Sequence, residues 1–479
     1  MKFQLMIFLC CISASLLAQN YFNKDVPFNG SAVFPQKEGG FMWGGVMLNA
    51  NSSYDLHLYE TDSTGKKLWE HSYGGDDMEL WGGGTTTDDG GYALAAESWS
   101  FAPPEDSITG YFSYIARISG EGDLVWEMVD FDSTQTDSFH WSSNKPYSII
   151  ETSDKGFMLV GQSIRNFTFV PYQPTYGDIY ILRLDSLGKK LWNKVYFHYG
   201  GEIGKDLIED RLTKNEFIVV GCWNVDTANN IIRPYIMKIN GQGDTLWTKL
   251  FDTGHFFSAI EPTNNPNEYL VTGNITVKIR SNGEIVWINE NQEGTQIREL
   301  PDSSGYLVSN SYQYVKFAKL DNSGKTIWER DMYQDYGFRI LDFQPLCDGT
   351  IVFTGQGRNE GKILHTDCEG NQINPSAFCA CKAPEPPIDP EPLPFEIIVF
   401  PTVLFSSESF TVKITSKPPN TEISLKVYDI LGKEVIGLNH LSEGKNEFVI
   451  PHISNALYIY RIYENGNIIK TSKILLGAY

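Results

Sequence analysis

The chain has 479 residues, of which 20% are charged, and a formal net charge of -21. A field of this sign repels nucleic-acid phosphates and anionic lipid headgroups, so the composition argues against binding either of them. Aromatic residues make up 13% of the chain and it contains 43 glycines, which is typical of an all-β protein rich in tight turns. The acidic balance suits a protein that works outside the cell.

The first segment, residues 1–19, has the pattern of a secretory signal peptide. Lys2 supplies the positive charge, the stretch from Leu5 to Ile12 is apolar, and small residues precede Gln19. The apolar stretch is too short to span a bilayer as a mature helix. We therefore expect export of the chain and removal of this segment, with no membrane span in the mature protein.

A repeat follows, in which a glycine stands four residues before a tryptophan. Neighbouring tryptophans are 40 to 66 residues apart, as from Trp247 to Trp287 and from Trp126 to Trp192. The six pairs are Gly65/Trp69, Gly122/Trp126, Gly188/Trp192, Gly243/Trp247, Gly283/Trp287 and Gly324/Trp328. A seventh copy keeps the turn before Gly370 but has Asn374 in place of the tryptophan.

Each copy reads as four short strands, the period of one propeller blade. The fold class is therefore expected to be all-β, with a seven-bladed β-propeller over residues 20–381. Residues 20–30 are expected to add the closing strand to the last blade, because a closed ring leaves no open end to cap.

The turn before each tryptophan strand has a physical rationale. Asp or Asn stands three residues before the glycine in five of the seven copies: Asp62, Asp185, Asn240, Asp321 and Asp367. Such a side chain accepts hydrogen bonds from its own turn, and the glycine supplies the positive φ. The alternative for these carboxylates is calcium binding, the only cofactor that the sequence raises. The tryptophans are expected to pack between neighbouring sheets.

Strand alternation also predicts which face of the propeller carries function. The first-to-second and third-to-fourth turns are short and share one face, whereas the connections on the other face are long and variable. Variable loops on a rigid scaffold commonly bind ligands, and exposed aromatic rings suit glycan or peptide recognition. The candidate ligand-binding residues are Trp99, Phe101, Trp141, Phe169, Tyr172, Tyr176 and Tyr199. The alternative is that these rings pack within their own loops.

No catalytic motif is found: the sequence lacks HExxH, a Walker A loop and GxSxG. Carboxylates are abundant, and a glycosidase needs only two in the right geometry. Candidates on the variable face are Asp76, Asp77, Glu79, Glu202 and Asp206, each of which is alternatively a solvated loop charge. We expect no catalytic residue and no protein metal site.

Five cysteines remain after the signal peptide, and four of them crowd into the last repeat: Cys347, Cys368, Cys379 and Cys381. In an oxidising compartment, one or two disulfides there would staple the final blade. The fifth, Cys222, is expected to be the unpaired thiol. Free thiols and a metal cluster are the alternatives for the group of four.

The tail is a separate unit behind a linker. Residues 382–394 are rich in proline and acidic residues and are expected to be extended and stiff. Residues 395–479 contain short alternating strands separated by turns, which predicts an immunoglobulin-like β-sandwich.

The tail also carries an ordered set of motifs. These are Val399-Phe400-Pro401, the segment from Leu425 to Val435, Ala456-Leu457-Tyr458, and Lys470 to Leu475. Together they resemble the type A C-terminal sorting domain of type IX secretion. The positions that carry the resemblance are Pro401, Tyr428, Asp429, Gly432, Leu457, Tyr458 and Lys473. The resemblance implies a Bacteroidetes-type bacterium, the type IX secretion machinery as a partner, and passage through the periplasm to the cell surface or medium.

The leading hypothesis is a non-enzymatic, secreted or cell-surface binding or adhesion protein whose propeller face recognises a glycan or a protein. One alternative is a carbohydrate-active enzyme with a carboxylate site near the propeller axis, which a cluster of two or three carboxylates in a deep axial pocket would favour. Another is a purely structural surface component.

Overall fold

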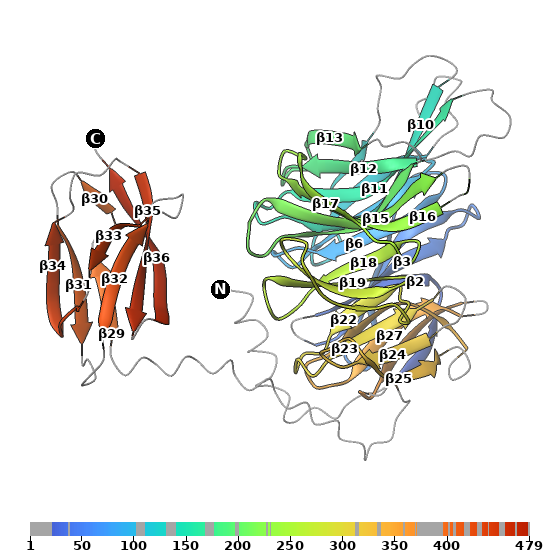
Figure 1. Ribbon diagram of the computed structural model, residues 1–479. Helices are drawn as coiled ribbons and strands as arrows, with labels where there is room; N and C mark the ends of the chain where they lie inside the picture. Colours follow the sequence, from blue (N-terminus) through green and yellow to red (C-terminus); the bar gives the residue numbers. More distant parts are fainter. Residues whose placement is uncertain are drawn as a thin grey trace. The chain divides into compact units, whose positions relative to one another are not determined.

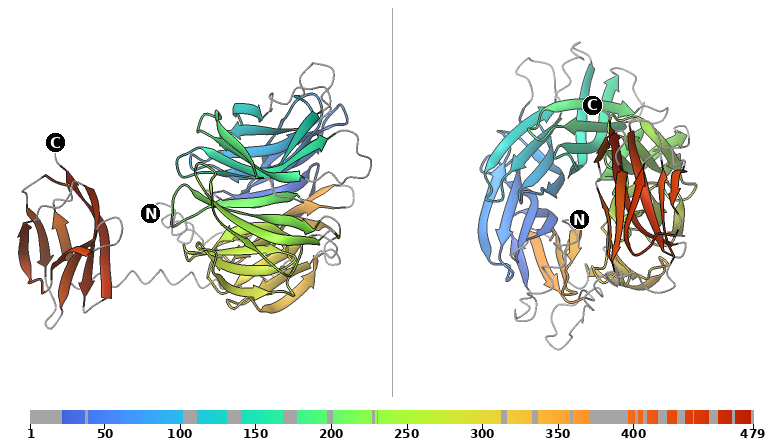
Figure 2. Two further views of the ribbon diagram at one scale, coloured as in Figure 1. Left: turned by 45° about the horizontal axis from the view of Figure 1, so that its top comes forward. Right: turned by 90° about the vertical axis from the view of Figure 1, so that its left-hand side faces the viewer.

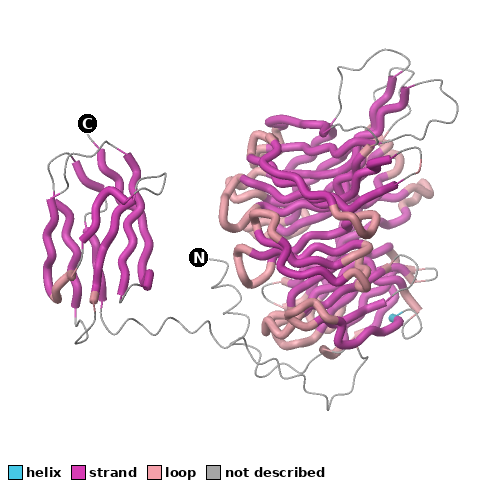
Figure 3. Tube along the Cα trace, viewed as in Figure 1, coloured by secondary structure: helices cyan, strands magenta, loops and turns pink. Residues whose placement is uncertain are grey.

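The computed structural model divides the chain into two compact units, residues Met1–Pro384 and Glu385–Tyr479, and this division falls inside the predicted linker. Every element with described bounds in the two units is a β-strand, and Figure 3 draws strands almost throughout. The structure describes residues 22–36, 39–101, 111–130, 140–167, 177–196, 201–226, 229, 231–311, 316–332, 337–357, 360–368, 370, 396–400, 403–405, 409–415, 422–428, 434–438, 440–449, 456–464 and 467–477. Within these ranges, no helix is long and apolar enough to cross a membrane. The predicted signal peptide and linker lie outside them.

The first unit contains seven four-stranded antiparallel sheets among the described residues. Sheets 1 to 3 are β2 (Asn29–Pro35), β3 (Phe41–Leu48), β4 (Tyr54–Thr61), β5 (Lys67–Tyr73); β6 (Glu79–Thr86), β7 (Tyr92–Ser98), β8 (Phe112–Ile118), β9 (Leu124–Asp130); and β10 (His140–Glu151), β11 (Phe157–Phe167), β12 (Gly177–Leu184), β13 (Lys190–Tyr196).

Sheets 4 to 7 complete the unit. They are β14 (Glu202–Glu209), β15 (Glu216–Asp226), β16 (Ile231–Asn240), β17 (Thr245–Leu250); β18 (Phe257–Pro262), β19 (Glu268–Gly273), β20 (Thr276–Arg280), β21 (Ile285–Asn289); β22 (Gln296–Glu299), β23 (Tyr306–Asn310), β24 (Lys316–Leu320), β25 (Thr326–Asp331); and β26 (Arg339–Pro345), β27 (Ile351–Gln356), β28 (Gly361–Thr366) with β1 (Asn23–Val26).

Burial follows from the position of each strand in its sheet. Three middle strands, β7, β8 and β12, are buried at every residue, because neighbouring sheets cover both of their faces. The fourth strands alternate between packed and exposed residues, as in β17. The continuous apolar runs and the alternating runs in the sequence therefore mark middle and outer strands.

The sheets form a propeller. The first strand of each sheet contacts the first strand of the next, and β2 of sheet 1 also contacts β26, β27 and β28 of sheet 7. Figures 1 and 2 show these sheets following one another around a common centre, with the N-terminal strands beside the last ones. The expected closing strand is confirmed: β1 pairs antiparallel with β28, with Asn23 opposite Leu364.

The turn glycines and the tryptophans interlock between sheets, as expected. The seven turn glycines have φ between 71° and 91°. Five of them lie against the tryptophan of the preceding sheet; a Cβ at Gly188, for example, would be 2.6 Å from the Trp126 ring. In the last sheet Phe22 takes the place of the missing tryptophan, because a Cβ at Gly65 would be 2.8 Å from its ring. The glycine is therefore required for space as well as for backbone conformation.

The second unit has two sheets, each formed from strands distant in sequence. The three-stranded sheet has β29 (Glu396–Phe400), β31 (Ser409–Thr415) and β34 (Gly444–Val449); the five-stranded sheet has β30 (Val403–Phe405), β36 (Asn467–Gly477), β35 (Ala456–Glu464), β32 (Ile423–Tyr428) and β33 (Glu434–Leu438). Buried residues come from both sheets, including Val412 and Ile414 from one and Leu425 and Ile462 from the other.

Four of the sorting-motif positions lie in the backbone of the five-stranded sheet. Tyr428 ends β32, and Leu457 and Tyr458 lie in β35. Lys473 of β36 pairs with Ile459, next to Tyr458. Pro401, Asp429 and Gly432 lie outside the described residues. The Leu457-Tyr458 motif and the final motif, Lys470 to Leu475, therefore lie on neighbouring strands.

Candidate functional site

The two faces of the propeller differ in the length of their connections. One face, here called the short-turn face, carries connections such as 152–156 and 185–189 of sheet 3. The opposite, long-connection face carries 131–139 and 168–176, which enter and cross the same sheet. Sheet 5 departs from the expectation, because only Asn274 and Ile275 join β19 to β20. The long connections are therefore concentrated around sheets 2 and 3.

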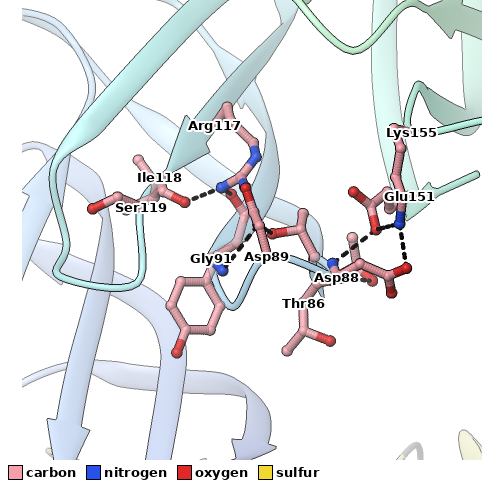
Figure 4. Close-up of polar contacts among 12 residues, drawn as sticks. Thr86, Asp88, Asp89, Gly91, Arg117, Ile118, Ser119, Glu151 and Lys155 are labelled. Atoms are coloured by element: carbon pink, nitrogen blue, oxygen red, sulfur yellow. Dashed lines mark hydrogen bonds and ion pairs between the residues drawn. The ribbon is translucent and has the colours of Figure 1, made fainter. Parts of the chain in front are cut away.

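The short-turn face is held together by a repeated hydrogen bond between neighbouring sheets. The Asp88 backbone N–H donates to a Glu151 oxygen at 2.9 Å, and the Ser153 N–H donates to a Glu209 oxygen at 2.6 Å. The same bond joins Asn264 to Glu299. Each acceptor is the last residue of the next sheet's first strand, so these carboxylates are committed to joining sheets. Figure 4 shows the first of these contacts, with Lys155 paired to Asp88.

A charged residue on the third strand lies opposite each of the six tryptophans, and three of these residues, Arg117, Arg183 and Lys238, are buried. Arg117 pairs with Trp126 in the sheet register, and its guanidinium bonds both oxygens of Asp89, one at 2.6 Å (Figure 4). Arg183 makes the same pair with Asp154, at 2.6 Å to each oxygen. Bidentate pairs of this kind fix both partners in orientation, which makes the first turn rigid.

In sheets 4 and 5, a lysine takes the place of the arginine and pairs with a glutamate. Lys238 pairs with Glu216, at 2.8 Å, and Lys278 with Glu268, at 2.5 Å. The position of each glutamate is a glycine in sheet 3, where a Cβ on Gly156 would lie 2.5 Å from the Arg183 guanidinium. The sequence shows this difference as Gly-Phe in some copies and Glu-Phe in others at the start of the second strand. The ion pair could not be predicted from this dipeptide alone, because its partner lies on the third strand.

The described aromatic candidates pack against neighbours in their own sheet. Trp99 lies 5.3 Å from Tyr111, ring centroid to ring centroid, and its backbone N–H donates to the Met78 carbonyl. Phe101 stacks on Tyr114 at 5.1 Å with an interplanar angle of 12°. Both candidate rings remain half-exposed, so each supports its loop while presenting some surface.

The side chains of the other aromatic candidates lie outside the described part of the structure. The backbone of Trp141 lies in β10, where it pairs with Asn166. Phe169, Tyr172, Tyr176 and Tyr199 lie outside the described residues.

The carboxylate candidates separate into three environments. Asp76 and Asp77 are exposed, as the solvated-charge alternative predicts. Glu79 is fully buried; burial raises its pKa, while the Ser98 hydroxyl, the Gly75 N–H and Ser100 donate hydrogen bonds to it.

The two remaining candidates lie on β14. Glu202 is buried at the start of the strand, and Asp206 follows its bulge.

Six of the seven first strands carry a bulge. A register shift occurs in β2, β6, β10, β14, β18 and β26. Asp206 of β14 and Asp342 of β26 come immediately after their bulges. Bulges commonly re-aim side chains. Sheets 4 and 7 therefore carry a carboxylate at the same position of their first strands.

These carboxylates belong to a charged cluster around Arg298 of β22, here called the axial cluster: Asp206, Glu261, Arg298 and Asp342. The Arg298 guanidinium pairs with Glu261 and bonds Asp342 at 3.0 Å. Asp206 adds a further attraction to Arg298. Each member comes from a different sheet, so the cluster links four consecutive sheets.

Two of the three carboxylates also accept hydrogen bonds from the backbone. Asp206 accepts from the N–H of Ile260 in the next sheet at 2.9 Å, and Asp342 accepts from the N–H of Val33 at 3.0 Å. Glu261 has no such anchor; burial raises its pKa to about 7, Arg298 lowers it, and the charges of Asp206 and Asp342 raise it further. The cluster therefore holds neighbouring sheets together through ion pairs and hydrogen bonds, and it contains a carboxyl, Glu261, with a pKa of about 7.

The described cysteines support two expectations. Cys368 is disulfide-bonded, which confirms a disulfide in the last repeat. Cys222 is a free, buried thiol, as expected, and burial raises its pKa to about 11. A thiol in that state is inert rather than nucleophilic at neutral pH.

The turn carboxylates act as the sequence predicts. An Asp62 oxygen accepts hydrogen bonds from the N–H groups of Thr64 and Lys66, and Asp185 does the same for Leu187 and Lys189. Across the described part of the chain, no group of three or more metal-ligating side chains is placed to hold an ion.

Comparison with known proteins identifies no family. No protein-family model matches the chain, and no curated protein matches it in sequence. Among solved structures, it is similar to the β-propeller domain of Cps50 (Swd1) from Myceliophteria thermophila, with 7% identity, a TM-score of 0.48 and coverage of 74% of this chain and 99% of that one. It is also similar to YCF48 bound to D1 peptide, with 9% identity, a TM-score of 0.43 and coverage of 74% and 96%.

A further similar structure is the extracellular domain of a putative hybrid two-component system from B. thetaiotaomicron. The identity is 12%, the TM-score is 0.43, and the match covers 94% of this chain and 55% of that one. The class of the protein, an all-β propeller, follows from its own sheet order and contacts.

Proposed function

We propose that this chain is an exported binding or adhesion protein: a seven-bladed propeller that recognises a glycan or a protein through its long-connection face, followed by an immunoglobulin-like sorting domain. The observation that carries the proposal is the difference between the faces. Turn carboxylates on the short-turn face are committed to joining sheets, whereas the opposite face carries long connections with half-exposed rings such as Trp99 and Phe101. Rigid scaffolds with variable loops are the usual platform for recognition.

The proposed route is type IX secretion to the cell surface or medium, through the periplasm. It is supported by the signal-peptide pattern and by the motif resemblance over residues 395–479. The pairing of Leu457 with Leu475 and of Ile459 with Lys473 is consistent with this route, because it places two of the motifs that carry the resemblance in one sheet. We infer that the secretion machinery is the tail's partner and that the propeller is its cargo.

The enzyme alternative has one specific observation in its favour, the three carboxylates of the axial cluster. Two of them, Asp206 and Asp342, already hold backbone N–H groups of the following sheets. A general acid and a nucleophile both need an oxygen that faces substrate. Only Glu261 lacks a backbone hydrogen bond, so the cluster offers one carboxyl without a backbone donor rather than the pair of free carboxyls that hydrolysis requires. This supports a non-enzymatic role.

The test uses the mature chain, from residue 20 onward, on an array of glycans and peptides, with a product assay on each hit. Trp99→Ala and Trp141→Ala are expected to weaken binding at least tenfold, because aromatic anchors dominate such contacts. Leu191→Ala is the matched control: this side chain is 54% exposed on an outer strand, away from the long connections. Turnover of a hit would contradict the proposal, and binding that is insensitive to both tryptophans would contradict its location.

A further inference from the structure

A groove of about 370 Å³ lies between sheets 4 and 5 on the short-turn face. It is bordered by three turns: 210–215 of sheet 4, and 263–267 and 281–284 of sheet 5. Its wall contains Leu212, Leu246 and Trp247, and its polar lining contains Glu216, Asn267 and Asn282. The volume falls within the range of small-ligand sites, about 300–1,000 Å³.

The first turn of sheet 4 forms one side of the groove, where it contributes Leu212. Residues 210–215 form a connection one residue longer than residues 152–156 of sheet 3. An Asp210 oxygen accepts the Leu212 N–H at 2.9 Å, and the Arg211 N–H donates to the Tyr269 hydroxyl at 2.8 Å. This anchored turn holds the Leu212 side chain outward, with 54% of it exposed.

Exposure of Leu246 by itself indicates nothing, because the residue before the tryptophan is an exposed aliphatic in every tryptophan strand: Leu68, Val125, Leu191, Leu246, Val286 and Ile327. This groove differs in that Leu212 and Trp247 line it together with the side-chain amides of Asn267 and Asn282. The Trp247 ring is fixed in place by contact with Gly283, where a Cβ would be 3.3 Å from the ring. The groove therefore offers a preformed apolar wall.

The polar side of the groove is close to neutral. Lys238 lies at its floor and is paired with Asp210 and with Glu216, and it donates to the Ser281 hydroxyl at 3.0 Å. Two carboxylates against one ammonium leave a small negative excess, which disfavours an anionic ligand. Glu216 is 26% exposed and keeps acceptor capacity.

The amides supply donors and acceptors that the protein leaves open. The Asn267 side chain makes no hydrogen bond with another described group, and it is half-exposed at the rim. The exposed Asn282 accepts the Glu284 N–H with its side-chain oxygen at 3.0 Å, and its NH₂ group adds two donors at the groove. A ligand with several hydroxyls would pair with such groups.

We propose that this groove binds one neutral sugar residue of a glycan, with an apolar ring face on Trp247 and Leu212 and hydroxyls hydrogen-bonded to Asn267 and Glu216. Flat apolar walls with a few convergent polar groups are the features that orient such a ligand. This site is separate from the proposed long-connection face and does not depend on it, because all of its turns lie on the opposite face.

The test is equilibrium binding of the mature chain to an array of neutral glycans and of sulfated or carboxylated ones. Leu212→Ala and Asn267→Ala are each expected to weaken binding of a neutral glycan about fivefold or more, the loss typical of one contact or hydrogen bond. Their thermal unfolding is expected to stay as in the wild type, because both side chains are at the surface. Leu187→Ala, a turn leucine that is 79% exposed, is the matched control and should bind normally.

Three results would overturn the proposal. One is the absence of any neutral glycan ligand, and another is preference for anionic glycans. The third is neutral-glycan binding that Leu212→Ala and Asn267→Ala leave intact while Trp99→Ala abolishes it. That third result would place glycan recognition on the long-connection face alone, and so would support the proposed function while removing this site. Loss of binding in the two groove variants only would support the groove site and would argue against glycan recognition on the long-connection face.

Discussion

Replacing Glu261 by glutamine is expected to stabilise the propeller above neutral pH and to flatten its pH dependence. Burial raises the pKa of Glu261 from 4.5 to about 7, and the charges of Asp206 and Asp342 contribute in the same direction. Between these two values the unfolded chain has lost the proton and the folded chain still holds it. The stability that the proton provides is therefore full below pH 4.5 and is lost as pH rises through about 7.

The magnitude follows from the size of the shift and from exposure. One pKa unit corresponds to about 1.4 kcal/mol, so a shift of this size has an upper limit of about 3 kcal/mol. A quarter of the Glu261 side chain is exposed, at 25%, so water screens part of the effect and about 1–2 kcal/mol is expected. Glutamine keeps an acceptor for Arg298 and removes the charge.

Tryptophan fluorescence is the appropriate measurement, because all 11 tryptophans precede the tail and report only the propeller. Urea unfolding of the wild type and Glu261→Gln should give similar stability near pH 4.5 and a more stable variant at pH 8. The same change at the exposed Glu121 is the control and should leave the profile unchanged. A Glu261→Gln protein that is less stable than the wild type at pH 8 would show that the glutamate acts there as a favourable ion pair, and would refute this reasoning.

Other changes test the packing between sheets, the axial cluster and the proposed secretion route. Gly156→Ala should destabilise the propeller by about 1–3 kcal/mol in urea unfolding, because its Cβ would meet the Arg183 guanidinium and a backbone carbonyl; an unchanged midpoint would mean that the guanidinium moves aside. Phe22→Ala removes a ring that is 5% exposed and should lower stability by about 3 kcal/mol, since it leaves a cavity at the ring closure; a smaller effect than that of an exposed leucine would argue against closure by β1. Asp342→Ala should cost about 3 kcal/mol because it removes one of the carboxylates paired with the buried Arg298 and leaves the Val33 backbone N–H without its acceptor, whereas Asp342→Asn should cost less; equal losses would show that the hydrogen bond to the Val33 N–H does not contribute. Deleting residues 395–479 should retain the propeller in the periplasm on cell fractionation, and normal surface delivery would contradict the proposed route.

The repeat was readable from sequence because each copy preserves two features with a local cause. The turn glycine needs a positive φ, and the tryptophan four residues later needs a partner without a side chain, as Gly188 is to Trp126. The closing strand followed from the requirement that a ring leave no edge. The replacement of the seventh tryptophan by Phe22 was not predicted, because that residue comes from the other end of the chain.

The axial cluster could not be predicted from spacing. Glu261, Arg298 and Asp342 are separated by about one blade each, and only the ring brings them to one point. The third-strand arginines were also missed: a charged residue within an apolar strand, such as Arg183, has a visible pattern, but its partner Asp154 lies in a turn two strands earlier. Both are long-range pairings that depend on closure of the fold.

The most direct test of the central claim is hydrogen–deuterium exchange of the mature chain with and without a ligand from the array. The ligand should be one that the Leu212→Ala variant still binds, so that the groove between sheets 4 and 5 is not involved. The account predicts protection within 99–111, 131–142 and 168–176 on the long-connection face, with the short turns unchanged. Protection confined to the short turns, such as 152–156, would contradict recognition through the long-connection face.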